Sequence, residues 1–157
     1  MASGVAHVVS VNISPGGIPK KPLQAARVDF AGLEGDGHNH EKHNSPRQAV
    51  CLLDLEVIEQ LRKEGYDLAP GSVGENITLR GGNLASLAIG DRIVFSGGVE
   101  LEYSKLRAPC YVLDAICPTL KEAMRGRIGI YAAVIKSGVI KPGETVRFIR
   151  QPAAASA

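Results

Sequence analysis

The chain has 157 residues, 45% of them hydrophobic and 22% charged, which is enough length and apolar material to bury one core. Its net charge of +2 argues against a nucleic-acid surface or a strong attraction to membranes and is compatible with a small anionic ligand. The three cysteines show no paired spacing, and the N-terminus has neither a basic lead-in nor a long apolar run. We therefore expect a reduced, cytoplasmic protein with one domain over residues 1–150 and a flexible tail at 151–157.

Short strands and polar turns are predicted for the first third of the chain. The alternation of Val5, His7, Val9, Val11 and Ile13 with other residues predicts a first strand. The run SPGGIPKKP at 14–22 ends it, because proline has no N–H for the ladder and adjacent glycines favour a bend. A second strand is predicted at 23–30, a long polar loop at 31–46 and an apolar strand at 47–53. A loop of this length inside a compact domain is usually functional or disordered.

The clearest helix signal lies at residues 54–64. Apolar residues recur there at helical spacing, with Asp54 placed to act as N-cap and Gly65 placed to end the helix. A second, shorter helix is predicted at 118–125, where a proline occupies the first turn.

Turn signals divide the remaining sequence into further strands. We predict strands at 75–80, 129–138 and 143–150 and a hairpin at 89–103. In the hairpin, Gly97 and Gly98 fit a two-residue turn in which both residues have positive φ. About seven short strands with two or three helices favour a closed or folded, mostly β structure over a parallel sheet with crossover helices.

Cys110 is the first candidate for chemistry. Arg107 and Lys105 precede it closely, and neighbouring cations lower a thiol pKa by favouring the thiolate, which is the reactive form. The alternative is that Cys110 is a small buried hydrophobic residue. Cys51, inside an apolar run, supports only that alternative. Cys117 directly precedes the predicted helix at 118–125, where backbone N–H groups can also stabilise a thiolate.

The polar loop carries a second candidate, GDGHNHEKH. It contains Asp36, His38, His40, Glu41 and His43. Two histidines separated by one residue in an extended segment lie on one side, and a third nearby could complete a zinc site with an open position. The alternative is a polar loop whose histidines have no ligand role.

Two glycine-containing segments form the third candidate. In GENIT, backbone and side-chain donors of Gly74, Asn76 and Thr78 could bind a phosphate or a heterocycle. In SPGGIPKK, the residues that could form an anion-binding bend are Ser14, Gly16, Gly17, Lys20 and Lys21. Neither segment matches the phosphate-binding G-x-x-x-x-G-K-[ST] pattern, and both could equally be turns with solvated lysines.

The order of these motifs resembles that of one known family. An N-terminal strand with SPGGIPK is followed by GLEGD, RQAV, GENIT, GDRI, RAPC and GRIGIYAAVIKSGVIKPGE. Over nearly the whole chain, this order resembles a single-domain member of the MOSC domain family, named for the C-terminal domain of molybdenum-cofactor sulfurases. The resemblance implies a mostly β fold of the MOSC or PK beta-barrel type. It also implies a cysteine that either carries sulfur as a persulfide or ligates molybdenum in a pterin dithiolene cofactor.

The resemblance also implies roles for individual residues. Cys110 corresponds to the family's cysteine, both as catalytic residue and as metal ligand, and Arg107 corresponds to the arginine of its motif. The residues that it places against the cofactor are Ser14, Lys20, Asn76, Thr78 and Arg127. A soft thiolate suits molybdenum or sulfane sulfur, and a guanidinium suits a pterin phosphate.

Several functions remain open at this point. The first is binding of the molybdenum cofactor, or sulfur carriage through Cys110, in cofactor sulfuration or metabolism. A second is reduction of N-hydroxylated compounds by the bound cofactor, a third is delivery of the cofactor to other proteins, and a fourth is a zinc hydrolase built on His38, His40 and His43. No pyridoxal-phosphate-binding half is recognisable in the sequence, so a separate cysteine desulfurase or molybdenum-cofactor enzyme is the expected partner.

Overall fold

The computed structural model describes residues 5–37, 46–109, 113–114 and 116–152 of the chain. The strands are β1 (Ala6–Ile13), β2 (Lys21–Leu23), β3 (Ala26–Asp29), β4 (Gly32–Leu33), β5 (Val50–Asp54), β6 (Ile77–Arg80), β7 (Arg92–Phe95), β8 (Glu100–Leu106), β9 (Ile130–Lys136), β10 (Gly138–Ile140) and β11 (Thr145–Ile149). The helices are α1 (Leu55–Lys63) and α2 (Leu120–Ala123), with 3₁₀ turns at Pro46–Gln48 and Leu84–Ser86.

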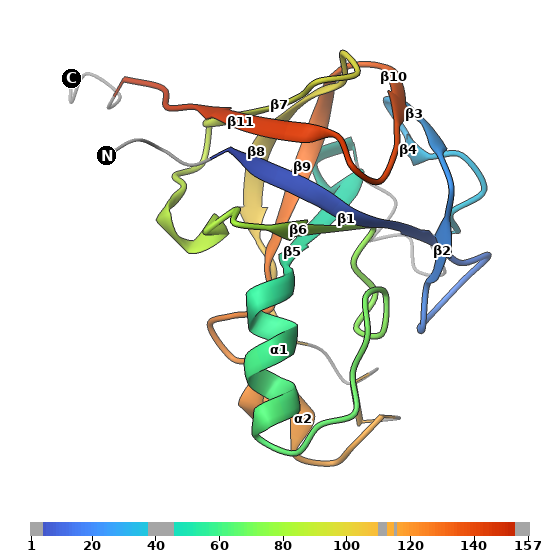
Figure 1. Ribbon diagram of the computed structural model, residues 1–157, viewed down its shortest axis with the longest axis vertical. Coiled ribbons are helices and arrows are strands. Elements are labelled where there is room, and N and C mark those ends of the chain that lie inside the picture. The colour runs from blue at the N-terminus through green and yellow to red at the C-terminus, as the bar shows by residue number, and fades with distance from the viewer. Residues whose placement is uncertain (1–4, 38–45, 110–112, 115, 153–157) are drawn as a thin grey trace.

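Seven of these strands close into a barrel (Figure 1). Hydrogen-bonded neighbours run β11, β7, β8, β9, β5, β6 and β1, and an antiparallel pairing of β1 with β11 joins the two ends. β2 extends the sheet beyond β1, while β10, β3 and β4 form a separate small sheet. Only β5 and β6 pair in parallel among the described strands. The predicted mostly β, barrel-like fold with few helices is confirmed.

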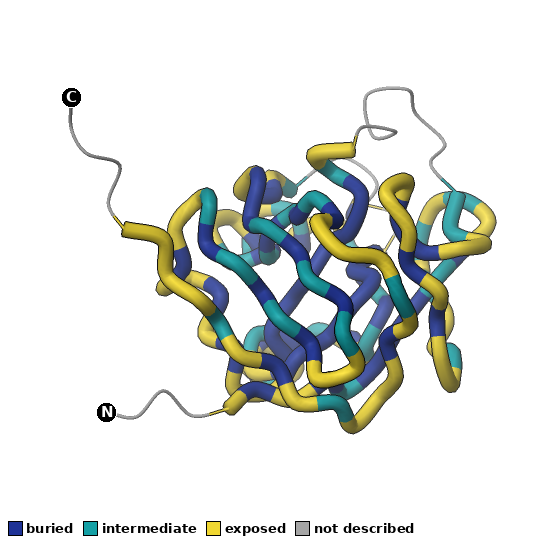
Figure 2. Tube along the Cα trace, turned by 90° about the horizontal axis from the view of Figure 1, so that it is seen from above, coloured by how far each residue is buried: buried dark blue, intermediate teal, exposed yellow. Residues whose placement is uncertain are grey.

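Two apolar cores lie on opposite sides of the barrel wall. One fills the barrel and includes Leu52 of β5 and Ile77 of β6, neither of which is exposed. The other lies between the outside of the barrel and the helices, where Leu53 belongs to the same cluster as Ile58 and Leu120. Both helices accordingly lie at one end of the barrel in Figure 1, and Figure 2 shows buried and less buried residues alternating along the strands. Because side chains fill the interior, a ligand site is expected outside the wall.

Helix α1 forms where periodicity predicts it and is the longest described helix. Its apolar residues are buried, and Gly65, with a φ of +104°, follows its C-cap. Asp54 has the extended backbone of an N-cap, but its side chain makes no capping bond. Instead, its Oδ2 accepts a hydrogen bond of 2.8 Å from the N–H of Leu84. No described helix is long and apolar enough to cross a membrane.

Strand β1 departs from the simple alternation predicted for it. Its pairing with β6 shifts register between Val8 and Ser10. Before the shift Ala6 and Val8 belong to the barrel core, and after it Val11 does. Because an inserted residue exchanges the two faces of a strand, Ser10 and Asn12 lie on the face opposite the barrel core. The predicted first strand is confirmed, but its apolar residues contact both cores, Val11 inside the barrel and Val9 outside it.

The hairpin turn between β7 and β8 also differs from its prediction. Gly98 has a φ of +110°, whereas Gly97 has no positive φ. The N–H of Phe95 donates to the Val99 carbonyl at 2.9 Å, so three residues rather than two form the turn. The N–H of Gly97 instead donates to the Glu144 carboxylate at 2.7 Å, a contact with a distant segment that local sequence does not reveal.

A further difference concerns the segment SPGGIPKKP, for which no strand is predicted. Its last residues form the start of β2, in which Pro22 faces Asn12 of β1. Proline is tolerated there because β2 is the last strand of its sheet and leaves one edge unpaired.

Candidate functional site

A buried polar network lies on the outer face of three neighbouring barrel strands, β5, β6 and β1. Cys51 and Thr78 alternate with residues of the barrel core, and Ser10 directly precedes Val11 of that core, so their side chains leave the wall on the other side. Thr78 pairs in register with Leu53 on β5 and with Ser10 on β1. We use the name polar network for Ser10, Asn12, Lys20, Asp36, Cys51, Glu75, Asn76, Thr78 and Arg107.

Asn76 connects three segments of this network. Its Oδ1 accepts a hydrogen bond of 3.0 Å from the N–H of Cys51. Its Nδ2 donates to the Asn12 carbonyl at 3.2 Å and to Asp36 Oδ2 at 3.0 Å. Asn76 is 3% exposed, so these bonds replace water for a buried amide. The side chain therefore ties β5, β1 and the loop after β4 together.

Lys20 and Asp36 form an ion pair beside Asn76. Lys20 Nζ lies 2.6 Å from Asp36 Oδ1 and 2.7 Å from Oδ2, and the Asp36 side chain is fully buried. Asp36 Oδ1 also accepts a hydrogen bond of 3.0 Å from the Ser14 N–H. Ser14 Oγ, in turn, donates to the Gly16 carbonyl at 2.8 Å and shapes the bend. The predicted anion-binding bend thus holds an internal carboxylate.

Glu75 and Thr78 continue the network on the other side of Asn12. Thr78 Oγ1 donates to Glu75 Oε2 at 2.9 Å, and Asn12 Nδ2 lies 3.3 Å from Thr78 Oγ1. Glu75 Oε2 also accepts a hydrogen bond of 2.9 Å from the N–H of Gly71. Asn12, Glu75 and Thr78 have no exposed surface. A fully buried carboxyl group in this position needs the donors that surround it.

Arg107 directly follows β8 and reaches into the network. Its Nη1 donates to Cys51 Sγ at 3.3 Å, and its Nη2 donates to the Val73 carbonyl at 2.5 Å. Arg107 is 9% exposed. A Cβ on Gly74 would lie 3.2 Å from Arg107 Nη2 and 2.9 Å from Ile18, so this glycine allows the guanidinium to pass close to the backbone. Its φ of +93° is a further reason for glycine.

Burial governs the ionisation of two groups beside Arg107. Burial raises the pKa of the Cys51 thiol, and the nearby Arg107 charge offsets only part of that effect. Burial likewise raises the pKa of Glu75, against the opposing effect of hydrogen bonds from Gly71 and Thr78. Burial therefore shifts both groups toward their neutral forms beside the Arg107 guanidinium.

Cys117 has the opposite electrostatic environment. It is half-buried, and a hydrogen bond from the backbone N–H of Thr119 is the main cause that lowers its pKa below the ordinary thiol value. The hydroxyl of Thr119, 3.6 Å from Cys117 Sγ, contributes in the same direction. Cys117 is therefore the more acidic of the two described thiols. Cys110 lies outside the described residues.

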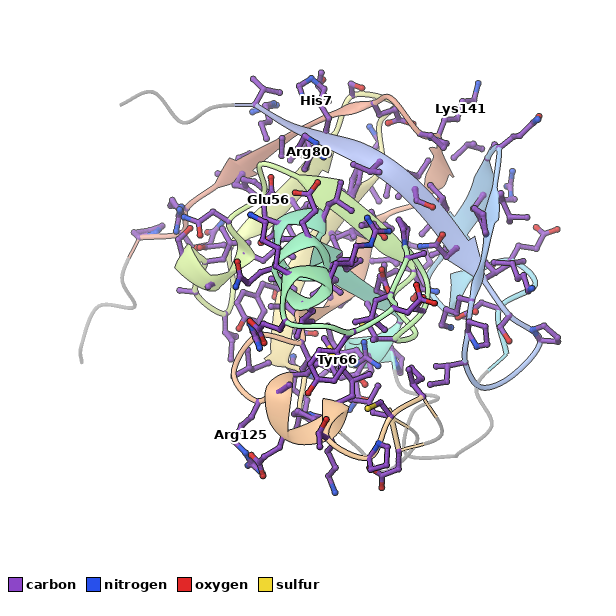
Figure 3. All side chains as sticks on the ribbon, turned by 60° about the horizontal axis from the view of Figure 1, so that its bottom comes forward. His7, Glu56, Tyr66, Arg80, Arg125 and Lys141 are labelled. Carbon is purple, nitrogen blue, oxygen red and sulfur yellow. The ribbon has the colours of Figure 1, made fainter. Side chains whose placement is uncertain are left out.

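Arg127 lies outside the polar network, at the C-terminal ends of α1 and α2. Its Nη1 and Nη2 donate to the Glu64 carboxylate at 2.9 and 2.7 Å, and its Nε donates to the Ala123 carbonyl at 2.6 Å. Figure 3 shows Tyr66 between the two helices, where it shares a hydrogen bond of 2.8 Å with Thr119. None of the bonds recorded for the described residues links Arg127 with the polar network.

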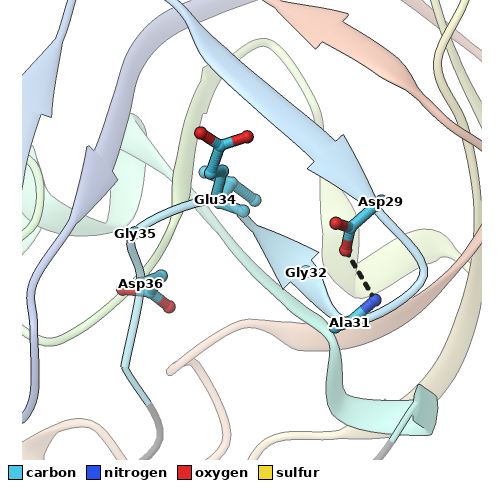
Figure 4. Close-up of a pocket in the computed structure, with 7 residues that line it drawn as sticks. Asp29, Ala31, Gly32, Glu34, Gly35 and Asp36 are labelled. Carbon is cyan, nitrogen blue, oxygen red and sulfur yellow. Dashed lines mark hydrogen bonds between the residues drawn. The ribbon is translucent and has the colours of Figure 1, made fainter.

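A surface cavity of about 370 Å³ adjoins the network at Asp36. Its lining consists of Asp29, Ala31, Gly32, Leu33, Glu34, Gly35 and Asp36. Figure 4 shows Asp29 bonded to the Ala31 N–H, at 2.9 Å. The described residues contain no group of three or more potential metal ligands. The predicted zinc ligands His38, His40 and His43 lie outside the described residues, so that prediction stays untested.

The structure brings most of the predicted cofactor-binding residues together. Asn76, Thr78 and Arg107 belong to the network, Lys20 joins it through Asp36, and Ser14 borders it. Their roles toward a cofactor stay predictions. Sequence reasoning missed the contributions of Asn12, Cys51 and Glu75. Glu75 could have been found, because it lies inside the GENIT motif. The hydrogen bond between Arg107 and Cys51 joins residues 56 positions apart, and no local pattern indicates it.

Comparison with known proteins places these features in a family. The sequence model of the MOSC domain matches residues 39–147. A curated protein called "Reductase", from Gibberella moniliformis strain M3125 / FGSC 7600, is 30% identical over 131 residues. That match covers 77% of this chain and 23% of the relative, so this chain spans less than a quarter of the relative's length.

Solved structures show the same fold. The YuaD protein of Bacillus subtilis superposes with a TM-score of 0.80 at 19% identity, over 95% of this chain and 98% of that one. YiiM from Geobacillus stearothermophilus gives a TM-score of 0.75 at 26% identity, over 96% of this chain and 78% of that one. Because the sequence model of the MOSC domain matches well over half of the residues of this chain, the chain belongs to the MOSC domain family.

Proposed function

We propose that this protein binds a molybdenum-pterin cofactor, or carries sulfur for one, beside the polar network on the outside of the barrel. The observation that carries the proposal is the convergence of Arg107, Asn76 and Thr78, which are distant in sequence, around Cys51 and Glu75. Membership of a family named for molybdenum-cofactor sulfurases supports it.

The chemistry of the network fits the phosphate and the heteroatoms of such a cofactor. Arg107 is a mostly buried cation, and a guanidinium is well suited to bind phosphate through paired hydrogen bonds. Asn76 offers an amide that can orient a polar ring edge. Lys20 already contacts both oxygens of Asp36, so it would share its charge between that carboxylate and a ligand.

The cysteine of the proposal is Cys110, three residues after Arg107. When bound, the cofactor would supply two-electron redox chemistry or accept a sulfur atom. Arg107 is held by Val73 and Cys51, and its N–H donates to the Gly129 carbonyl at 3.2 Å. These bonds hold both the side chain and the backbone of Arg107 in place, three residues before Cys110. Cys110 would serve as thiolate ligand or as the site of a persulfide.

The curated relative called "Reductase" favours one narrower candidate. In this version N-hydroxylated compounds would be the substrates, and each N–O bond cleaved would take two electrons from a donor outside this chain and two protons, giving the amine and water. In the sulfur-carrier version, a separate cysteine desulfurase loads Cys110 with sulfane sulfur.

The test is elemental analysis of the purified full-length chain for molybdenum and zinc, together with fluorescence of oxidised pterin. Molybdenum and pterin should be present together, and Cys110→Ser should lose the metal while Cys117→Ser, the matched control, keeps it. If the purified protein is bare, incubation with a cysteine desulfurase and cysteine should place sulfane sulfur on Cys110. Zinc without pterin would contradict the proposal and favour the hydrolase.

A second pair of variants tests the network itself. Arg107→Lys keeps a positive charge but loses the fork that reaches both Val73 and Cys51, so pterin retention should fall. Arg125→Lys is the control, because Arg125 is exposed and bonds only Glu122 among its recorded partners. Equal retention by the two variants would show that Arg107 does not bind the cofactor.

A further inference from the structure

Glu75 is an ionisable residue of the polar network with no exposed surface. Its two carboxyl oxygens differ. Oε2 accepts hydrogen bonds from the Gly71 N–H and the Thr78 hydroxyl, both at 2.9 Å. Within the described part of the chain, Oε1 has no hydrogen-bond partner. A buried carboxylate oxygen without a donor leaves negative charge uncompensated, whereas the same oxygen of a neutral carboxylic acid carries no charge and is much less costly to bury.

The Glu75 carboxyl also holds a loop that carries Arg107. Gly71, whose N–H bonds Glu75, has a φ of +88° and lies against the Lys20 backbone, with no room for a Cβ. Two residues later, the Val73 carbonyl accepts a hydrogen bond from Arg107 Nη2. Glu75 and the Arg107 guanidinium therefore bind the same short, sterically constrained loop, at residues 71–74.

We propose that Glu75 is protonated and uncharged in the folded protein, and that it positions Arg107 through the loop at 71–74 without cancelling the charge of the guanidinium. An ionised carboxylate at this place would attract Arg107 and reduce its attraction for an anionic ligand. A neutral carboxyl keeps the hydrogen bonds and adds no negative charge beside Arg107. Protonation of Glu75 and its contact with the loop do not depend on the proposed function; the effect on binding of an anionic ligand rests on it.

The groups around Glu75 come from every side of the network. Arg107 follows β8 and favours ionisation, but burial outweighs it and raises the pKa of Glu75. Cys51 on β5 is kept neutral by its own burial. Beyond Asn76, Lys20 and Asp36 compensate each other as an ion pair. Such an environment resembles other sites in which burial holds a carboxylic acid neutral so that it can act in hydrogen bonding.

The first experiment tests protonation directly in the full-length protein. The infrared difference spectrum between wild type and Glu75→Gln at neutral pH should contain the carbonyl stretch of a protonated carboxylic acid. Asp54→Asn identifies the band of the other buried carboxyl that lacks a partner on one oxygen. Carboxylate bands in place of the acid band in the Glu75→Gln difference would overturn the proposal, whatever the protein binds.

The second experiment tests positioning, with inorganic sulfate as the anionic probe because its charge is constant across the pH range used. Glu75→Gln is neutral and retains an acceptor for Gly71 and Thr78, whereas Glu75→Met is neutral and of similar size but has no acceptor. Sulfate affinity should be within about twofold of wild type in Glu75→Gln and fall about tenfold in Glu75→Met. Equal affinities in the two variants would overturn the positioning role.

A pH profile gives the same information if Glu75→Met does not fold. Glu75 becomes ionised as the pH rises through its elevated pKa, so sulfate affinity of wild type should decline in that range while that of Glu75→Gln changes less. Parallel profiles would contradict the proposal. Failure of wild type to bind sulfate at all would overturn the anion site but leave the infrared result to decide protonation.

Discussion

Replacement of Asn76 tests whether the polar network is built as the structure shows. In Asn76→Ala, the Cys51 N–H and the Asn12 carbonyl lose buried partners, and Asp36 loses one of its donors. Pro22 of β2, which pairs with Asn12 of β1, has no N–H that could bond the Asn12 carbonyl instead. An unsatisfied buried backbone group costs about 1–3 kcal/mol, so the free energy of unfolding should fall by about 2–5 kcal/mol.

Asn76→Asp separates hydrogen bonding from charge. The introduced carboxylate keeps an acceptor for Cys51 but places an oxygen where Nδ2 now lies 3.0 Å from Asp36 Oδ2. Two carboxylates at such a separation repel, which raises the pKa of the introduced group above its unfolded value. Its protonated form can still donate to Asp36. Stability is therefore retained below the unfolded pKa, near 4, and is lost as pH rises through the elevated folded pKa.

Chemical denaturation at several pH values measures both effects. At neutral pH, Asn76→Asp should be less stable than wild type by at least as much as Asn76→Ala, and it should recover part of that loss near pH 5. Asn83→Asp is the control for added charge, because Asn83 is exposed and its side chain makes no capping bond. A loss below about 1 kcal/mol in Asn76→Ala would refute the network as an element of stability.

Three further predictions concern other parts of the chain. The folded pKa of Asp54, about 6, exceeds its unfolded value of 3.8, so stability from the protonated form is lost as pH rises through about 6. Asp54→Asn should therefore be more stable than wild type at neutral pH by about 1–3 kcal/mol in denaturant titrations. Gly71→Ala should lower the melting temperature far more than Gly65→Ala, because both need positive φ but only Gly71 lacks space for a Cβ. Mass spectrometry should show Cys117 alkylated faster than Cys51, because Cys117 is more exposed and more acidic.

Each of these predictions has a contrary outcome. A pH dependence of stability that is identical in wild type and Asp54→Asn would show that the carboxyl is not protonated in the fold. Equal melting temperatures of the two glycine variants would mean that the loop at 71–74 adapts to a side chain. Faster labelling of Cys51 than of Cys117 would mean that β5 opens readily. Cys110, which flanking cations predict to be reactive, should label at least as fast as Cys117.

Local sequence predicted those elements whose causes are local. Helix α1 follows from its own periodicity and from Gly65, and the strands follow from runs between turn residues. The three-residue turn after β7 could not be predicted in the same way. Gly97 donates its N–H to Glu144, 47 positions away, so local glycine content indicates the wrong turn.

The candidate site was predictable only in part for the same reason. The family resemblance indicated Asn76, Thr78 and Arg107, and the structure brings them into one network. The sequence places Asp36 in a possible metal-binding loop, whereas in the structure its carboxylate accepts hydrogen bonds from Lys20 and Asn76. No spacing rule reveals such partners, because each bond joins segments that meet only after the barrel has closed.

The register shift in β1 explains how a packed barrel acquires a polar site on its outside. Without the shift, Ser10 and Asn12 would follow Ala6 and Val8 into an apolar interior, where their polar groups would lack partners. With it, Val11 fills the interior and the polar side chains turn toward Thr78 and Glu75 on the outer face. The same irregularity therefore preserves the core and assembles the network. Deletion of Val9, the extra residue, would leave Val11 facing the core and Ser10 and Asn12 facing outward. It should therefore spare anion binding and lower stability only through the lost packing of Val9 against the outer core.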